Sequence, residues 1–161
     1  MGLGKAKSMT IDMQAAFSVL LPKAITWAED EAKAAIATGR ALSAAEEDLA
    51  RSVGVARPQL IRISLAETLS MPVDPILQDA AVQTGLLGPN MTGLALGYAV
   101  FARRGYHTMR LLSHEFRHVQ QYEQAGSIAA FLLTYLREIL QFGYANAPLE
   151  VDARAHERDT V

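Results

Sequence analysis

The segment His114-Glu115-Phe116-Arg117-His118 constrains this chain more than any other, because it places an HExxH motif inside the pattern of an amphipathic helix. Apolar side chains recur around it at spacings of four and three (Leu112, Phe116, Val119), which predicts a helix over about 107–124. Two histidines four residues apart lie one helical turn from each other, so both imidazoles can reach one ion. The motif therefore predicts a helix that carries two metal ligands, with a glutamate between them that can act as a base.

Two further helices are predicted after the motif, because glycines and capping residues divide the remaining chain. Gly126 ends the first helix, and Ser127 caps a second one whose apolar residues follow the 3.6-residue period up to Gly143. Asn146 is expected to cap a third helix, with Pro148 in its first turn. The middle helix is long enough to run out and bring the chain back toward the motif.

The third predicted helix is expected to bring a third metal ligand to the motif. A catalytic zinc usually takes three protein ligands and keeps the fourth position for water. Glu150, at the start of the third predicted helix, is the predicted donor, and Asp152, His156 and Glu157 are its rivals. Acidic residues near a helix start also favour the positive end of the helix dipole, which is the structural explanation for Glu150.

The upstream part of the chain is predicted to be a helical scaffold followed by strands. A helix from Thr10 to about residue 41 contains Pro22, which either begins a second helix or kinks one long helix. The spacing from Ser43 to Glu46 is that of a capping box and opens a short helix that ends near Gly54. These residues are interpreted as packing scaffold.

The residues between the scaffold and the motif alternate in the manner of strands. Ile61, Ile63 and Leu65 alternate with polar residues, and a second strand is predicted over 94–101. Prolines make 71–75 irregular, and a short helix or loop is expected over 76–84. The predicted fold class is therefore α+β: N-terminal helices, a small twisted sheet, the HExxH helix and C-terminal helices. We expect one domain over 1–161, with a scaffold at 1–56 and a sheet and metal-site core at 57–161.

Composition excludes several classes of function and ligand. The chain of 161 residues has no cysteine, so any metal must be held by histidines and carboxylates. Its net charge is −2 and no Lys/Arg stripe could follow a phosphate backbone, which argues against nucleic acid as a partner. No apolar run approaches the roughly 18 residues of a membrane span. The lack of cysteine and of a signal-peptide core favours the cytoplasm.

The C-terminal third resembles a known family of metallopeptidases. The octet 114–121 reads HExxHxxQ, and Pro148-Leu149-Glu150-Val151-Asp152-Ala153 follows it. In both features the chain is similar to gluzincins, the zincin metallopeptidases with a glutamate ligand, and in particular to small bacterial HExxHxxQ members. The resemblance implies a zincin-like fold, zinc bound by His114, His118 and Glu150, and Glu115 as general base and then acid. A peptide or protein would be the substrate.

The roles of four residues around the predicted site are less determined. Many gluzincins have an acidic residue four positions after the ligand glutamate, where this chain has Arg154, so other residues must support the ligands. Tyr144 or Tyr135 could donate a hydrogen bond to the oxyanion that forms during hydrolysis. Gln121 lies on the helix face of His114, two turns on, and is either a support for the ligands or a packing residue.

Two other interpretations compete with a peptidase. One is a non-catalytic zinc-binding or protein-interaction domain that retains the zincin fold, for which the replacement at position 154 is the motive. The other is a structural helical domain in which the motif arose by chance. The motif itself specifies neither a substrate sequence nor an oligomeric state.

Overall fold

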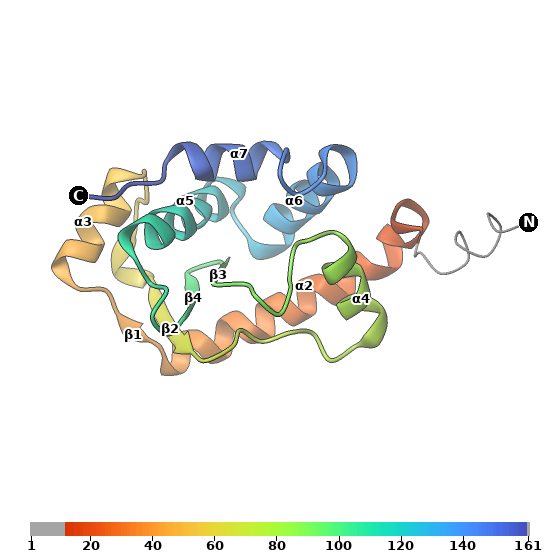
Figure 1. Ribbon diagram of the computed structural model, residues 1–161, viewed down its shortest axis with the longest axis horizontal. Helices are drawn as coiled ribbons and strands as arrows, with labels where there is room; N and C mark the ends of the chain where they lie inside the picture. The colour runs from red at the N-terminus through yellow and green to blue at the C-terminus, as the bar shows by residue number, and fades with distance from the viewer. Residues whose placement is uncertain (1–11, 161) are drawn as a thin grey trace, which may run out of the picture.

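The structure is a computed structural model that describes residues 12–160, and over these residues it is an α+β fold with six α-helices and a four-stranded mixed sheet (Figure 1). This confirms the predicted fold class at the level of α+β. The helices are α2 (Met13–Thr38), α3 (Ala44–Ser52), α4 (Pro75–Gln83), α5 (Met109–Ala125), α6 (Ile128–Phe142) and α7 (Pro148–Ala155), with a short 3-10 helix η1 (Pro58–Leu60).

The sheet has the strand order β1-β2-β4-β3. Its strands are β1 (Arg40–Ala41), β2 (Arg62–Ala66), β3 (Gly93–Leu96) and β4 (Ala99–Arg103). β2 and β4 are parallel, whereas β1 pairs antiparallel with β2 and β3 pairs antiparallel with β4. β3 therefore lies at one edge of the sheet. In Figure 1 the helices α5 and α7 run above the strands and α2 runs below them.

The single strand predicted over 94–101 is wrong, because the chain turns back at its middle. Gly97 has φ +62° and opens a two-residue turn between β3 and β4. A two-residue hairpin turn with a glycine at its first position matches the twist of the flanking strands. Large and small residues alternate through this turn as they do in a strand, so the sequence pattern did not indicate that the chain reverses direction here. The short strand β1 was not predicted either.

Helix α2 is one continuous helix through Pro22, so the interpretation with a second helix starting there is wrong. Asp12 caps it by accepting a hydrogen bond from the Ala15 backbone N–H, and the predicted cap Thr10 lies outside the described residues. Small buried residues along α2 (Ala28, Ala32, Ala35) let it approach β2, β3, β4 and α6 closely. Within 12–160, the helices are too short or too polar to cross a membrane.

Helix α6 begins and ends where the sequence predicts, and the ends of α5 lie within two residues of the predicted ones. Thr108 and Ser127 accept backbone hydrogen bonds as caps, and Gly126 and Gly143 follow the last residues of the two helices. The predicted stripe of α5 (Leu112, Phe116, Val119) is buried. Aromatic side chains join the two helices, since the rings of Tyr122 and Phe131 stack with centroids 3.8 Å apart.

Helix α7 begins at Pro148, but the predicted cap Asn146 is wrong. Ala147 occupies the capping position and has no side-chain acceptor to offer. Instead Glu138 of α6 accepts a hydrogen bond from the Leu149 backbone N–H at 2.9 Å. A carboxylate at a helix start also interacts favourably with the helix dipole. The neighbouring helix thus supplies the cap and fixes the position of α7 next to α5.

Candidate metal centre

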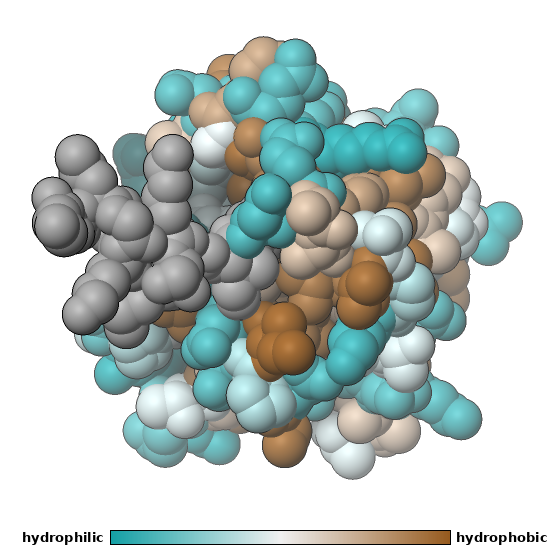
Figure 2. Space-filling model, turned by 90° about the vertical axis from the view of Figure 1, so that its right-hand side faces the viewer, coloured by the Kyte–Doolittle hydropathy of each residue, from teal (hydrophilic) through white to brown (hydrophobic). Residues whose placement is uncertain are grey.

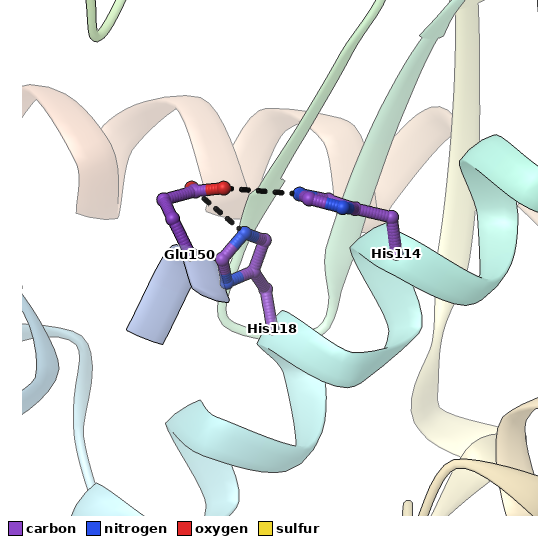
Figure 3. A group of neighbouring side chains, drawn as sticks. All are labelled: His114, His118 and Glu150. Atoms are coloured by element: carbon purple, nitrogen blue, oxygen red, sulfur yellow. Dashed lines mark ion pairs between the residues drawn. The ribbon is translucent and has the colours of Figure 1, made fainter. Parts of the chain in front are cut away.

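Three side chains from two helices converge at one point of the structure. His114 and His118 extend from α5, Glu150 extends from the first turn of α7, and all three point toward one another (Figure 3). Their ligand atoms lie within 4.8 Å of one another, and this is the one such group of three or more among residues 12–160. His114 Nε2 is 3.2 Å from Glu150 Oε2, and His118 Nε2 is 3.0 Å from Glu150 Oε1.

The orientation of the His118 ring follows from the hydrogen bonds of Gln121. The Gln121 amide nitrogen donates to Leu149 O at 3.0 Å and to Asp152 Oδ2 at 2.8 Å, and both of these atoms can only accept. The Gln121 Oε1 atom then faces His118 Nδ1 at 2.8 Å, so the proton lies on Nδ1. Asp152 is held in turn by Arg117, with Nε to Oδ2 at 2.8 Å. His118 Nε2 is therefore left to face Glu150.

The His114 ring is oriented by a different residue. His114 Nδ1 lies 3.0 Å from Glu157 Oε1, and since a carboxylate only accepts, Nδ1 carries the proton here as well. Glu157 follows the end of α7 and also pairs with Arg110 of α5, with NH1 to Oε2 at 3.1 Å. Both imidazoles thus donate from Nδ1 and direct Nε2 toward Glu150.

Glu150 is one of the most buried ionisable side chains of the chain, with 2% of its surface exposed. Three groups satisfy its carboxylate: the two imidazoles and the Tyr135 hydroxyl, which donates to Oε1 at 2.5 Å. A buried carboxylate without such partners would be strongly destabilising. The site therefore requires positive charge around Glu150.

Without a metal, protonated histidines would supply this charge, and the pKa values of both histidines are raised. Burial alone lowers the pKa of His114, but the hydrogen bond to Glu150 and the charges of Glu115 and Glu150 outweigh it and raise the pKa to about 9. The pKa of His118 is also raised, because the same carboxylates outweigh its burial. Burial acts to raise the pKa of Glu150, and the hydrogen bonds from both histidines reverse this and hold it well below its usual range.

Glu115 stands apart from this hydrogen-bonded group. It is 6% exposed, and within 12–160 no side chain or backbone group donates a hydrogen bond to its carboxylate. Its Oε1 atom lies against Gly93 of β3, at 2.9 Å from the point that a Cβ on that glycine would occupy. Burial raises the pKa of Glu115, and the neighbouring His118 and His114 oppose this. The carboxylate is thus placed at a cavity wall with its proton affinity increased.

A cavity of about 860 Å³ adjoins the site and is lined by His114, Glu115, His118 and Glu150. All four residues of β3 border it, as do Trp27 of α2 and residues of the loop over 85–92. Its charged lining residues all come from α5, α7 and Glu157, while the walls formed by α2, α4 and α6 are uncharged. Figure 2 shows the face on which α2 begins and α4 lies, where apolar side chains gather between polar ones.

The two candidate tyrosines occupy different positions. Tyr135 is buried and engaged with Glu150, whereas Tyr144 is half-buried and forms part of the cavity wall. Burial raises the pKa of Tyr144, and the charges of Glu150 and Glu115 raise it further, so its hydroxyl stays protonated and able to donate. Both tyrosines border the cavity beside the ligands, and Tyr144 is the more exposed of the two.

The rivals of Glu150 do not belong to the converging group, although Glu157 also borders the cavity. Asp152 holds Gln121 and Arg117, and Glu157 contacts the far nitrogen of His114. His156 is half-buried, with 31% of its side chain exposed, and its Nδ1 lies 2.8 Å from Asp152 O. Arg154 donates to Ala145 O in the loop before α7, and so supports the chain rather than a ligand.

Sequence reasoning did not assign the supporting roles of Glu157, Tyr135, Arg110 and Gly93. Each acts across a large sequence separation, such as the 43 residues between His114 and Glu157. No local pattern marks such a contact. The alternation of charge over Arg154-Ala155-His156-Glu157-Arg158-Asp159 was the one signal that this segment could pair with a neighbouring element.

Comparisons of the chain with protein-family models, with curated proteins and with solved structures find no match.

Proposed function

We propose that this chain is a zinc-dependent hydrolase with a zincin-like fold, and that it cleaves peptide bonds. The observation that carries the proposal is the convergence of His114, His118 and Glu150 beside Glu115 at the wall of a large cavity. Two histidines and one carboxylate form a ligand set found in catalytic zinc sites, which take three protein ligands. The convergence joins residues from two helices, so a chance HExxH match does not account for it.

The distances support zinc as the ion. Zinc bonds to histidine nitrogen and carboxylate oxygen at about 2.0–2.2 Å in tetrahedral geometry, which places two ligand atoms about 3.3 Å apart. The two nitrogen–oxygen separations in the structure, 3.2 Å and 3.0 Å, are close to that value. The nitrogens that face Glu150 are also the ones left free by Glu157 and Gln121, as a metal-binding imidazole requires. These two separations go to different oxygens of Glu150, and the ligand atoms of the three residues lie up to 4.8 Å apart, so the ligands would draw closer together on binding the ion.

Zinc bound there would act as a Lewis acid and bring the pKa of a water molecule toward about 7. Glu115 would accept a proton from the attacking water at its carboxylate, which no other residue described engages. As the carbon–nitrogen bond breaks, Glu115 would deliver the same proton to the leaving amine, so its charge is restored. Its raised pKa suits a group that must hold a proton between these two steps.

Two further features support a peptide as the substrate. β3 is an edge strand whose four residues line the cavity, and an extended peptide can pair with such an edge through backbone hydrogen bonds. The Tyr144 hydroxyl, in the cavity wall, would donate a hydrogen bond to the carbonyl oxygen as negative charge develops on it.

Two substitutions test the proposal. We expect His114→Ala to abolish stoichiometric zinc binding, measured by elemental analysis of protein purified without chelators. Glu115→Gln should retain zinc and lower kcat/KM on a peptide library by about 10²–10⁴-fold, since it removes the base and leaves the ligands in place. Wild-type protein that binds no zinc would refute the proposal. Zinc binding without hydrolysis would instead support a non-catalytic zinc-binding domain.

A further inference from the structure

Residues 157–159 lie along α5 and contact it at several points. Arg110 of α5 pairs with Asp159 through two hydrogen bonds of 3.0 Å and with Glu157 at 3.1 Å. Ser113 accepts a hydrogen bond from the Arg158 backbone N–H at 2.8 Å and is completely buried. The three α5 residues at 110, 113 and 114 thus hold 157–159 on one side of the helix.

Glu157 is the point at which this segment meets the metal centre. One of its carboxylate oxygens accepts from His114 Nδ1 and the other pairs with Arg110, so the side chain is fixed at both oxygens. It lies on the side of the His114 ring opposite Nε2, the nitrogen that faces Glu150. In this arrangement Glu157 does not bind the ion itself. It acts on the ion only through His114.

We propose that Glu157 is the positioning residue for His114, and that 157–159 form part of the metal centre together with Arg110. The proposal rests on the zinc site proposed above. The Glu157 carboxylate fixes the imidazole with its proton on Nδ1 and increases the electron density at Nε2, which strengthens the bond to a cation. Arg110 acts one step further out, by holding Glu157. Position 154, where an acidic residue would be expected from the resemblance, is not needed for this role.

Different residues support the two histidines, so the proposed role of Glu157 concerns His114 alone. His118 is held by Gln121, which Asp152 and Arg117 hold in turn, and none of these residues contacts Glu157. Loss of Glu157 should therefore loosen one ligand only. A protein with two of three ligands still fixed should retain its fold and bind zinc more weakly.

The experiment measures Zn²⁺ affinity of the full chain by competition with a chelator. Glu157→Ala should weaken binding by about 10–100-fold, the usual cost of removing a residue that supports a ligand. Glu157→Gln retains an oxygen that can accept from Nδ1, and should lie between Glu157→Ala and wild type. Glu29→Ala, which removes an equal charge from an exposed position of α2, is the matched control and should bind like wild type. Thermal unfolding of the metal-free variants shows whether each has folded.

A second comparison separates positioning from general stabilisation. Arg110→Ala should weaken Zn²⁺ binding in the wild-type background and have little further effect in the Glu157→Ala background, since it acts through Glu157. Equal effects in both backgrounds, or a Glu157→Ala protein that is folded and binds Zn²⁺ like wild type, would overturn the inference. A wild-type protein that binds no Zn²⁺ would refute the proposed zinc site itself, which is a different result.

Discussion

At the scale of single residues, the position of Glu115 depends on the absence of a side chain at position 93. A Cβ on Gly93 would lie 2.9 Å from Glu115 Oε1 and 2.9 Å from Leu111 Cδ1. Non-bonded atoms do not approach so closely, so one of the neighbours must move. We therefore expect Gly93→Ala to displace the Glu115 carboxylate and to lower kcat/KM for peptide hydrolysis by about tenfold or more, because misplacing a reacting group is costly. Zinc content should be unchanged.

The matched control for this substitution is Gly88→Ala. Gly88 also borders the cavity, but a Cβ added there would meet no atom within 4 Å. Steady-state kinetics on the same peptide should give values close to wild type for Gly88→Ala. Equal activity of the two variants would show that Gly93 does not determine where Glu115 lies.

At the scale of secondary-structure elements, the cap that α6 provides for α7 contributes to stability. Glu138→Ala removes the acceptor of the Leu149 N–H and should lower the free energy of unfolding of the metal-free protein by about 1 kcal/mol, as for other helix caps. Glu138→Gln retains an acceptor oxygen and should recover most of this loss. Urea unfolding followed by circular dichroism measures both. A Glu138→Ala protein as stable as wild type would show that water replaces the cap without cost.

The elements that the sequence predicted are those with local signals. Ser127 and the two glycines after α5 and α6 mark helix ends through contacts within one turn, so these ends were correct, whereas the cap Thr108 was not predicted. The hairpin at Gly97 was missed because a glycine in an alternating stretch is compatible with both a strand and a turn. The cap of α7 was missed because its acceptor lies 11 residues away on another helix.

In the candidate site, too, the residues with a local sequence signal were predicted and the others were not. His114, Glu115 and His118 share one helix, so their spacing predicted that both imidazoles reach one ion and that Glu115 lies about 100° round the helix from His114. Glu150 could be proposed because one helix of suitable length separates it from the motif. The residues that hold the ligands, such as Glu157, Tyr135 and Arg110, meet them only through packing of distant segments. Periodicity and capping signals carry no information on such contacts.

At the scale of the whole molecule, protons and zinc should compete for the same site. The pKa of His114 is about 9 in the folded metal-free protein, against 6.5 for an ordinary histidine. Between these two pH values the folded chain binds more protons than the unfolded chain, so the free energy of unfolding of the metal-free protein should fall as pH rises through this range. The contribution of His114 is fully present below pH 6.5 and lost above pH 9.

Zinc bound at the proposed site would reverse this dependence, because the ion would have to displace a proton from His114, whose Nε2 faces Glu150. We expect the apparent affinity for Zn²⁺ to rise by about tenfold per pH unit for each displaced proton, up to about pH 9, where His114 becomes neutral. Chelator competition from pH 6 upward, corrected for the titration of the chelator, measures this slope. His107→Ala, which removes an exposed histidine outside the site, should leave the slope unchanged. An affinity that is independent of pH would mean that zinc binds elsewhere on the molecule.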